Sequence, residues 1–464
     1  MEPPRSVNVV DVCHVVPSTD LPDSAAAAPK SLPLTFFDIL WLRLPPVQRL
    51  FFYETSSSKS SFYNSIIPKL KHSLSLTLHH YLPLAGNLTW PKDCPKPVIR
   101  YVDGDGVSLT IAESNMDFYH LSGDDFREVK ECHPLLPELT VSQERAQVIA
   151  LQVTLFPNDG FSVGITAHHA VLDGKTSMSF MKSWCRLCKQ LGGGDSTLGP
   201  GLTPFYDRDV VKDPAGLEAI YANEWLNEKG PNNRSLMIWE LNLRPGLVRG
   251  TFELTREDAE KLKKTLLQDS LLHVSTFSLT CSYTWVCLVK ALRIREKKTH
   301  LGFNVDCRSR LKPALPENYF GNCITGRGAF VETEGLLGEE GLSFGIKAIS
   351  KAIKSLDDGV LNRAEILASI IIGAKAKTEV TETETRSGSV SFAGSPRFEV
   401  YGIDFGWGRP RKVEMTSVDR TGAICISDSR NGNGGVEIGL VLKLHEMEAF
   451  ASEFSKGLAK LRSI

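Results

Sequence analysis

The chain has 464 residues, of which 42% are hydrophobic and 23% are charged, and its 53 Lys and Arg nearly balance its 54 Asp and Glu. This composition is ordinary for a globular protein, and the length fits about two domains of common size. A net charge of -1 argues against a dedicated nucleic-acid binder, which would carry a basic excess.

The location of the protein is suggested by what its segments lack. Residues 1–28 do not have the basic-then-apolar layout of a secretory signal. No segment offers the roughly 18 uninterrupted apolar residues of a membrane helix. We therefore expect a cytoplasmic protein whose ten cysteines are free thiols. Cys185 and Cys188 form a C-x-x-C, but without a second pair nearby we expect them to pack inside a helix.

The first half of the chain shows both helical and strand periodicity. Apolar residues recur every four positions from Phe62 to Leu78, which indicates an amphipathic helix, although Pro68 would kink or delay it. We expect an edge strand at 7–16, a helix at 61–80, a β-hairpin at 98–111, and an antiparallel pair at 148–156 and 161–167.

The second half restarts after a helix at 176–190. The triple glycine at 192–194 ends that helix and opens the best linker candidate, which runs to about residue 249. We expect strands at 251–254, 301–306, 389–393, 399–403, 412–417, 423–427 and 436–444, and helices at 256–267, 275–291, 342–355, 361–374 and 446–461.

Strands and helices thus mix through two comparable halves. This pattern predicts an α/β protein with two similar-sized domains, each built on a mixed β-sheet flanked by helices. We expect an N-terminal domain over 1–195, a crossover linker over 196–245 and a C-terminal domain over 246–464.

One candidate for chemistry is the string from His168 to Gly174, which reads HHAVLDG. A histidine at the end of a strand can project into a cleft, and imidazole can accept a proton from an attacking hydroxyl near neutral pH. Asp173 could hold the histidine or brace the loop. The spacing alone is weak, because His120 and Asp124 repeat it in a segment expected to be a loop. A buried, hydrogen-bonded histidine is the alternative to a catalytic one.

A second unusual string is DFGWG, from Asp404 to Gly408. Its glycines allow backbone shapes that other residues avoid, and Trp407 offers a flat surface and one N–H donor. By itself the string is expected to be a tight turn. We do not expect a kinase, because no HRD-type catalytic loop and no glycine-rich loop accompany the Asp-Phe-Gly.

Together these motifs resemble the BAHD acyltransferase family, in which HxxxDG lies mid-chain and DFGWG nearer the C-terminus. The resemblance covers essentially the whole chain. Residues 32–38, LPLTFFD, resemble the family's N-terminal signature, and 319–323, YFGNC, resemble a motif of its anthocyanin and flavonoid glucoside branch. It implies a chloramphenicol acetyltransferase-like fold with a channel between the domains, in a monomeric, cytosolic plant enzyme that needs no metal. It also implies that a stretch near DFGWG packs on the first domain.

The resemblance assigns roles to particular residues. His169 would be the general base, and Asp173 would turn away from the substrate and pair with Arg308. Trp407 would lie close to the reacting centre, where its N–H could help to hold the oxyanion. Asp404 would be structural.

The implied co-substrate is acyl-CoA, which would not be bound permanently. Ser275 and Thr276 stand at an expected helix start, where free backbone amides favour anions such as phosphate. Gly394 and Ser395 belong to a loop that resembles the family's pantetheine-contacting stretch. These four residues are the candidates for binding CoA.

The branch uses either malonyl-CoA or a hydroxycinnamoyl-CoA. A malonyl carboxylate needs a cation, for which Lys182 is the main candidate beside Lys175 and Arg186. A hydroxycinnamoyl group needs an apolar slot, to which Phe36, Phe37 and Trp41 could contribute, and Asp38 is a further pocket candidate. We expect malonyl transfer to the sugar 6-hydroxyl of a phenolic or flavonoid glucoside. The alternatives are a hydroxycinnamoyl-CoA-dependent enzyme and a non-catalytic relative that binds another protein.

Overall fold

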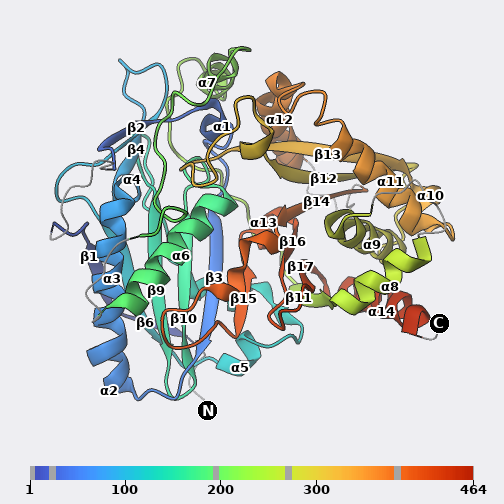
Figure 1. Cartoon of the computed structure of the whole chain (residues 1–464), viewed down its shortest axis with the longest axis horizontal. Helices are drawn as coiled ribbons and strands as arrows, with labels where there is room; N and C mark the ends of the chain where they lie inside the picture. The colour runs from blue at the N-terminus through green and yellow to red at the C-terminus, as the bar shows by residue number, and fades with distance from the viewer. Residues whose placement is uncertain (1–5, 20–27, 192–197, 267–273, 381–387, 463–464) are drawn as a thin grey trace.

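The computed structural model describes residues 6–19, 28–191, 198–266, 274–380 and 388–462. The described chain forms two lobes, each built around its own β-sheet (Figure 1). The triple glycine at 192–194 lies outside the described residues.

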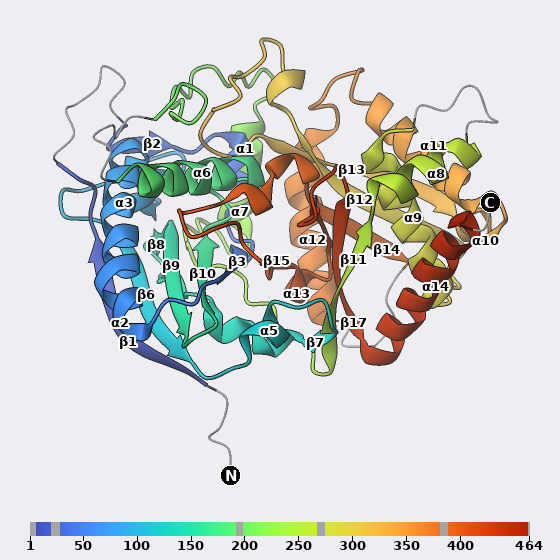
Figure 2. The ribbon, with the colours of Figure 1, turned by 60° about the horizontal axis from the view of Figure 1, so that its bottom comes forward.

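The first lobe is built on a six-stranded sheet. Helices α3 (Ile67–His80) and α6 (Gly174–Gln190) belong to this lobe and contact each other (Figure 2). Its strands, in spatial order, are β1 (Val7–Val15), β6 (Val107–Ser114), β9 (Ile149–Phe156), β10 (Gly160–Ala167), β3 (Val47–Glu54) and β15 (Lys412–Met415).

The second lobe is built on a seven-stranded sheet, in which β12 pairs in parallel with β14 and β14 with β16, while the other pairs are antiparallel. Both large sheets are mixed, because β6 and β9 are also parallel. The strands are, in order, β13 (Ile324–Glu332), β12 (Lys298–Asp306), β14 (Ser389–Gly394), β16 (Ile424–Asp428), β17 (Val436–Lys443), β11 (Leu247–Leu254) and β7 (Arg127–Glu128). The helices of this lobe are α8 (Arg256–Leu266), α9 (Thr276–Ala291), α10 (Thr333–Leu337), α11 (Gly341–Lys354) and α14 (Leu444–Arg462).

A small four-stranded sheet and several short helices complete the described structure. The sheet contains β2 (Ser31–Pro33), β5 (Val98–Arg100), β4 (Asn87–Thr89) and β8 (Arg145–Gln147). The remaining α-helices are α1 (Phe36–Ile39), α2 (Lys59–Ser61), α4 (Leu82–Ala85), α5 (Phe118–Leu121), α7 (Leu217–Asn227), α12 (Leu367–Val380) and α13 (Val418–Thr421).

The two lobes exchange strands. β15 comes from the C-terminal part of the chain but pairs with β3 in the first sheet, and β7 comes from the N-terminal part but pairs with β11 in the second. Buried charges lock this exchange: Glu414 of β15 forms ion pairs with Arg127 of β7 and Arg249 of β11. The two exchanged strands are therefore joined to each other and to β11 by one cluster of buried charges.

Two strand predictions were wrong. The segment 98–111 is not a hairpin, because β5 pairs with β2 and β4 in the small sheet while β6 pairs with β1 and β9 in the first. The segment 399–403 forms a 3₁₀ turn (Val400–Gly402) instead of a strand. There the carboxylate of Asp428 accepts the N–H groups of Val400 and Tyr401, so these amides need no strand partner.

The other expected elements are present with shifted ends. The helix expected at 61–80 begins with a π-helical turn (Phe62–Ile66), and α3 follows it with Pro68 in its first turn, where the missing N–H is tolerated. The linker candidate is not featureless, since it contains α7. Among the described residues, no helix is long and apolar enough to cross a membrane.

Candidate active site

His169 stands at the junction between β10 and α6. The strand ends at Ala167, and the next residue, His168, still donates its N–H to the carbonyl of Val148. Four residues after His169, Asp173 caps α6: its Oδ1 accepts the N–H of Thr176 at 2.8 Å. A strand end and a helix cap thus hold the short loop that carries His169.

The imidazole of His169 is held by an aromatic neighbour and by its own backbone. The indole of Trp41 stacks on it, with ring centroids 4.6 Å apart and planes 8° from parallel. The carbonyl oxygen of His169 accepts a hydrogen bond from Nδ2 of Asn322 at 2.9 Å. Its Nδ1 is buried without a hydrogen-bond partner while the residue keeps some exposure, so Nε2 is the nitrogen that a substrate can reach.

Burial lowers the pKa of His169 to about 4, and this effect outweighs the opposing influence of its own backbone and of Asp173. The imidazole is therefore neutral at neutral pH. A neutral imidazole with one accessible nitrogen can accept the proton of a hydroxyl group. Burial also lowers the pKa of the neighbouring His168 to about 4.

Asp173 is fully turned away from solvent, toward the second lobe. Its Oδ2 lies 2.7 Å from Nη1 of Arg308 and accepts the N–H of Cys323 at 3.1 Å. Burial is the largest single influence and would raise the pKa of Asp173. The charge of Arg308 and the hydrogen bonds from Arg308, Thr176 and Cys323 together outweigh it and hold that pKa below its ordinary value. Asp173 and Arg308 therefore form an ion pair at neutral pH. This pair joins the His169 loop to the 3₁₀ turn (Arg308–Arg310) that follows β12.

The segment 319–323 is the hub of this network. Nη2 of Arg308 donates to the carbonyls of Tyr319 (3.2 Å) and Gly321 (3.0 Å). Asn322, in the same segment, donates to His169 from one side and to Oδ1 of Asp38 through both its N–H (2.8 Å) and Nδ2 (3.2 Å). The arginine that holds Asp173 and the asparagine that holds His169 are thus positioned by one five-residue segment.

The structure places Asp38 behind this segment and not in a pocket. The carboxylate is completely buried, and in addition to Asn322 it accepts the N–H of Thr35 at 3.0 Å and lies 3.6 Å from Nη2 of Arg208. Its oxygens are therefore occupied. Phe36 and Phe37 line a small apolar cavity with residues of the α7 and α12 regions.

Trp407 lies at the other end of β10 from His169. Its ring packs edge-on against Phe161, with centroids 6.0 Å apart, and Phe161 precedes His169 by eight residues. Eight residues of extended strand span roughly 26 Å. The expected placement of Trp407 beside the reacting centre is therefore not what the structure shows, and its N–H is too far away to hold an oxyanion there.

The DFGWG string is a closed turn tied to α6. Oδ1 of Asp404 accepts the N–H groups of Gly406 (2.8 Å) and Gly408 (3.0 Å), both glycines having positive φ. Its Oδ2 lies 2.7 Å from Nζ of Lys189, near the end of α6. Asp404 thus stabilises the turn, as expected from the string alone.

The candidates for binding CoA lie in two places. Ser275 caps α9, and its Oγ accepts the N–H of Ser278 at 3.0 Å, while Thr276 Oγ1 lies 3.4 Å from Nζ of Lys263. Gly394 ends β14 with φ of 84°, and a Cβ there would lie 2.4 Å from the carbonyl oxygen of Ile426. Ser395 follows it, and its Oγ accepts the N–H of Arg397 at 3.2 Å.

Of these two places, the loop after β14 is close to the His169 junction. Phe398 of this loop packs on Gly174, the first residue of α6, so closely that a Cβ there would lie 2.6 Å from the phenyl ring. Lys182, the expected cation for a malonyl group, lies further along α6, where its Nζ is paired with Glu399 at 2.8 Å. Its charge is already compensated.

Two residues of this region were not assigned a role from the sequence. Asn322 belongs to a recognised motif, but nothing in the motif says that its side chain holds the His169 backbone. Arg49 is the other, a buried cation on β3. In the sequence, the one sign of its role is that this charged residue directly precedes the apolar run LFFY of residues 50–53.

A family model described as the Transferase family matches residues 6–457 of this chain. The chain belongs to this family, the BAHD acyltransferases, and is an acyl-transferring enzyme.

Among curated proteins, the chain is 42% identical to phenolic glucoside malonyltransferase 1 of Arabidopsis thaliana, over 98% of both chains. It is 43% identical to malonyl-CoA:anthocyanidin 5-O-glucoside-6''-O-malonyltransferase of the same plant, again over 98% of both. Agmatine coumaroyltransferase of that plant is 37% identical over 97% of this chain and 99% of its own.

Solved structures share the fold. Vinorine synthase superposes with a TM-score of 0.67 at 22% identity, covering 96% of both chains. TRI101 of F. sporotrichioides, solved with coenzyme A and T-2, superposes with a TM-score of 0.66 at 15% identity, covering 92% of this chain and 98% of its own. The α/β fold with two lobes and mixed sheets is therefore confirmed.

Proposed function

We propose that this protein transfers the malonyl group of malonyl-CoA to the sugar 6-hydroxyl of a phenolic or flavonoid glucoside, with His169 as the general base. The observation that carries the reaction type is a neutral, accessible imidazole at the junction of two lobes, held by Trp41 and Asn322. The donor and acceptor are supported by the two malonyltransferases that are more than 40% identical over nearly the whole chain.

The chemistry needs few groups because a thioester is already an activated acyl donor. As the sugar oxygen attacks the thioester carbonyl, Nε2 of His169 takes the hydroxyl proton. The tetrahedral intermediate then collapses, the C–S bond breaks, and the imidazolium returns the proton to the departing thiolate of CoA. Binding both substrates on one site supplies the proximity that the uncatalysed reaction lacks.

Asp173, Arg308 and Asn322 are positioning residues in this mechanism. None of them needs to touch the substrate, because the ion pair fixes the loop and the amide fixes the His169 carbonyl. Replacing any of these three side chains should displace the imidazole of His169, while the imidazole itself stays in the protein.

We also propose the co-substrate contacts, the location, the oligomeric state and the domain bounds of this protein. Acyl-CoA is a co-substrate, and Ser275, Thr276, Gly394 and Ser395 remain our candidates for contacting it. We propose a cytosolic monomer whose N-terminal domain covers 1–195, followed by a crossover over 196–245 and a C-terminal domain over 246–464. Equilibrium sedimentation of the purified protein tests the monomer.

A turnover assay tests the proposed function. Purified protein receives malonyl-CoA with and without a simple aryl glucoside, and free thiol is measured over time. We expect thiol release that requires the glucoside and is lost in His169→Ala. Release that does not require a glucoside, or that survives in His169→Ala, would contradict the proposal.

A hydroxycinnamoyl donor is the second candidate. It is favoured by the similarity to a coumaroyltransferase and by the indole of Trp41, which stacks on His169. An aromatic donor would stack on such a surface. Replacing malonyl-CoA with coumaroyl-CoA in the same assay separates the two candidates.

A further inference from the structure

Arg49 is a buried cation that the rest of the protein does not neutralise. It lies on β3 between two neighbours, Ile165 of β10 and Met415 of β15, and only 5% of its surface is exposed. Within the described residues, the one hydrogen bond of its side chain runs from Nη1 to Sδ of Met178, on α6, at 2.5 Å. A thioether is a weak acceptor and carries no charge.

The other buried arginines of the described chain differ from Arg49 because each has a carboxylate partner. Arg43, Arg127, Arg249 and Arg308 are each ion-paired with a buried carboxylate. For Arg49, no carboxylate of the described residues lies within ion-pair distance. Asp428 acts on it only through space, and that carboxylate already accepts the N–H groups of Val400 and Tyr401.

A buried charge without a counter-charge lowers the stability of the fold. We therefore expect an anion from outside the protein to pair with Arg49. Burial lowers the pKa of Arg49, consistent with this cost. Arginine stays protonated in proteins, and its planar fork matches a carboxylate. A carboxylate brought in by a ligand would satisfy the charge and both donors of the fork.

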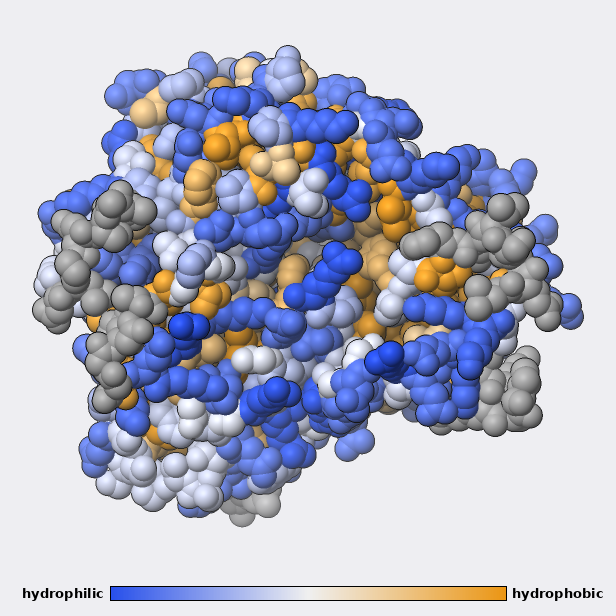
Figure 3. Space-filling model, in the orientation of Figure 1, coloured by the Kyte–Doolittle hydropathy of each residue, from blue (hydrophilic) through white to orange (hydrophobic). Residues whose placement is uncertain are grey.

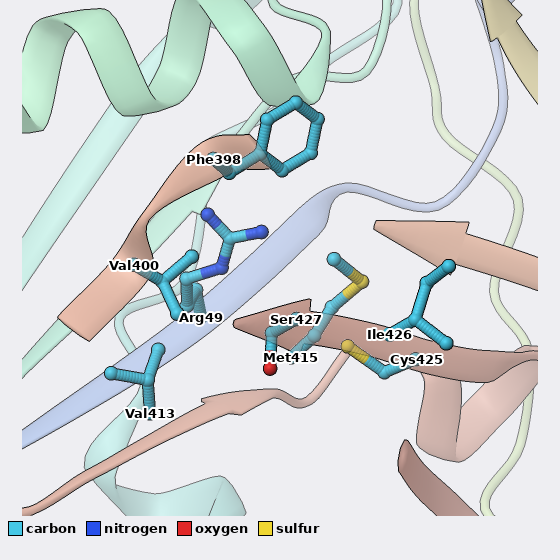
Figure 4. A pocket seen from close by; sticks show the side chains of 8 residues that line it. All are labelled: Arg49, Phe398, Val400, Val413, Met415, Cys425, Ile426 and Ser427. Atoms are coloured by element: carbon cyan, nitrogen blue, oxygen red, sulfur yellow. The ribbon is translucent and has the colours of Figure 1, made fainter. Parts of the chain in front are cut away.

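The guanidinium of Arg49 faces a pocket between the two lobes. Figure 4 shows it rising from β3 and pointing toward the ring of Phe398, with β16 on the other side. In the space-filling view, apolar residues show between the two lobes (Figure 3). The pocket is lined by Arg49, Phe398, Val400, Val413, Met415, Cys425, Ile426 and Ser427. Arg49 is the one charged residue in this lining.

This pocket neighbours the base. Ile165, the partner of Arg49 across the strands, precedes His169 by four residues, which corresponds to roughly 13 Å of strand. The start of α6 also connects the pocket to the His169 loop: Met178 contacts Arg49, and Gly174, five residues after His169, packs on Phe398 of the pocket lining.

We propose that Arg49 binds the free carboxylate of the malonyl group and so selects this donor. The inference rests on the proposed function and names the residue that gives it its donor specificity. Lys182, the cation expected from the sequence, is paired with Glu399 on the rim of the same region, whereas the charge of Arg49 is open.

Arg49→Met tests the proposal, with malonyl-CoA compared with acetyl-CoA on the same glucoside. Both donors carry the same CoA phosphates, and only malonyl-CoA carries the carboxylate. Methionine keeps much of the length without the charge. We expect kcat/KM for malonyl-CoA to fall on the order of 100-fold, while kcat/KM for acetyl-CoA changes by less than about threefold. Arg49→Lys, which keeps the charge without the fork, should fall in between.

Binding without turnover provides the second readout. Malonyl-CoA should raise the melting temperature of the wild-type protein more than acetyl-CoA does, and Arg49→Met should lose this difference. The unliganded variant should melt no lower than the wild type, because it removes an unpaired buried charge.

Several outcomes would overturn the proposal. An equal loss with both donors would assign Arg49 to a CoA phosphate or to the fold. Unchanged preference in Arg49→Met, or loss of preference in Lys182→Met instead, would assign the carboxylate elsewhere. A wild-type protein that does not use malonyl-CoA at all would instead refute the proposed function, so the two failures are distinguishable.

Discussion

Nη1 of Arg308 lies 2.7 Å from Oδ2 of Asp173, and neither side chain is exposed to solvent. The two residues come from different lobes, one from the cap of α6 and the other from the segment after β12. Because the same arginine also donates to the carbonyls of Tyr319 and Gly321, the ion pair connects the His169 loop to the segment that holds His169 itself.

We expect Asp173→Ala to lower both stability and rate. It removes the buried carboxylate partner of Arg308 and leaves only the partly exposed Asp306, 3.1 Å away, to offset the buried charge. Removing one partner of a buried ion pair typically costs about 3–5 kcal/mol. Urea unfolding measures the free energy of unfolding, and the same preparation gives kcat. As a control, Asp173→Ala with Arg308→Met should recover part of the lost stability but not the rate. Unfolding and turnover identical to wild type in Asp173→Ala would show that the pair does not brace the loop.

His169→Ala should abolish transfer while the protein remains folded. A positioned general base typically contributes about 10²- to 10⁴-fold to a rate. The ring of Trp41 loses its stacking partner, so a modest fall in melting temperature is expected. Circular dichroism and thiol release on one sample check both statements. Turnover within tenfold of wild type would remove His169 from the role of base.

Asn322→Ala should reduce kcat with little effect on KM for the donor. The variant removes the hydrogen bond to the His169 carbonyl and leaves the buried carboxylate of Asp38 with one donor fewer. Loss of such a bond costs about 1–3 kcal/mol. Steady-state kinetics separate the two constants. If KM rose and kcat stayed constant, Asn322 would act on substrate binding and not on the base.

Trp407→Phe distinguishes a distant turn from an oxyanion donor. Phenylalanine keeps an aromatic contact with Phe161 but has no N–H. With Trp407 roughly 26 Å of strand from His169, we expect kcat within about threefold of wild type. Removing a true oxyanion donor costs about 10²–10³ in kcat, and a loss of that size would place Trp407 at the reacting centre.

The rate should depend on pH below the usual range of histidine. Because burial lowers the pKa of His169 to about 4, the imidazole stays neutral through pH 5, and kcat/KM should decline only below that. Stability follows the same sign: the contribution of His168 and His169 is complete above about pH 6.5 and is lost as pH falls from there toward 4. An acid limb of kcat/KM centred near 6.5 would show that His169 is solvated in the free enzyme.

Local pattern predicted most elements of this fold. The β9–β10 pair and α6 are signalled by neighbours in the sequence, a turn between two apolar runs and a helix after a cap, so the junction that carries His169 was within reach. The failures came from distant partners. β6 pairs with β1, about a hundred residues away, and no property of residues 98–111 shows that β5 belongs to another sheet.

His169 and Asp173 could be predicted from the sequence, whereas the residues around them could not. A strand-end histidine followed by a capping aspartate has a pattern of its own, and the partner Arg308 was reached only through resemblance. Trp407 was misplaced because a motif conveys order along the chain but not distance in space. Arg49 could not be assigned because its significance lies in the absence of a carboxylate nearby, which only three-dimensional packing of the described residues reveals.

One measurement tests the central claim most directly. The purified protein receives equal amounts of malonyl-CoA and coumaroyl-CoA with a panel of flavonoid and simple phenolic glucosides, and the products are read by mass. Our account predicts glucosides that gain a malonyl group in wild type and no product in His169→Ala. Products that carry only coumaroyl groups, or no product with either donor, would contradict it.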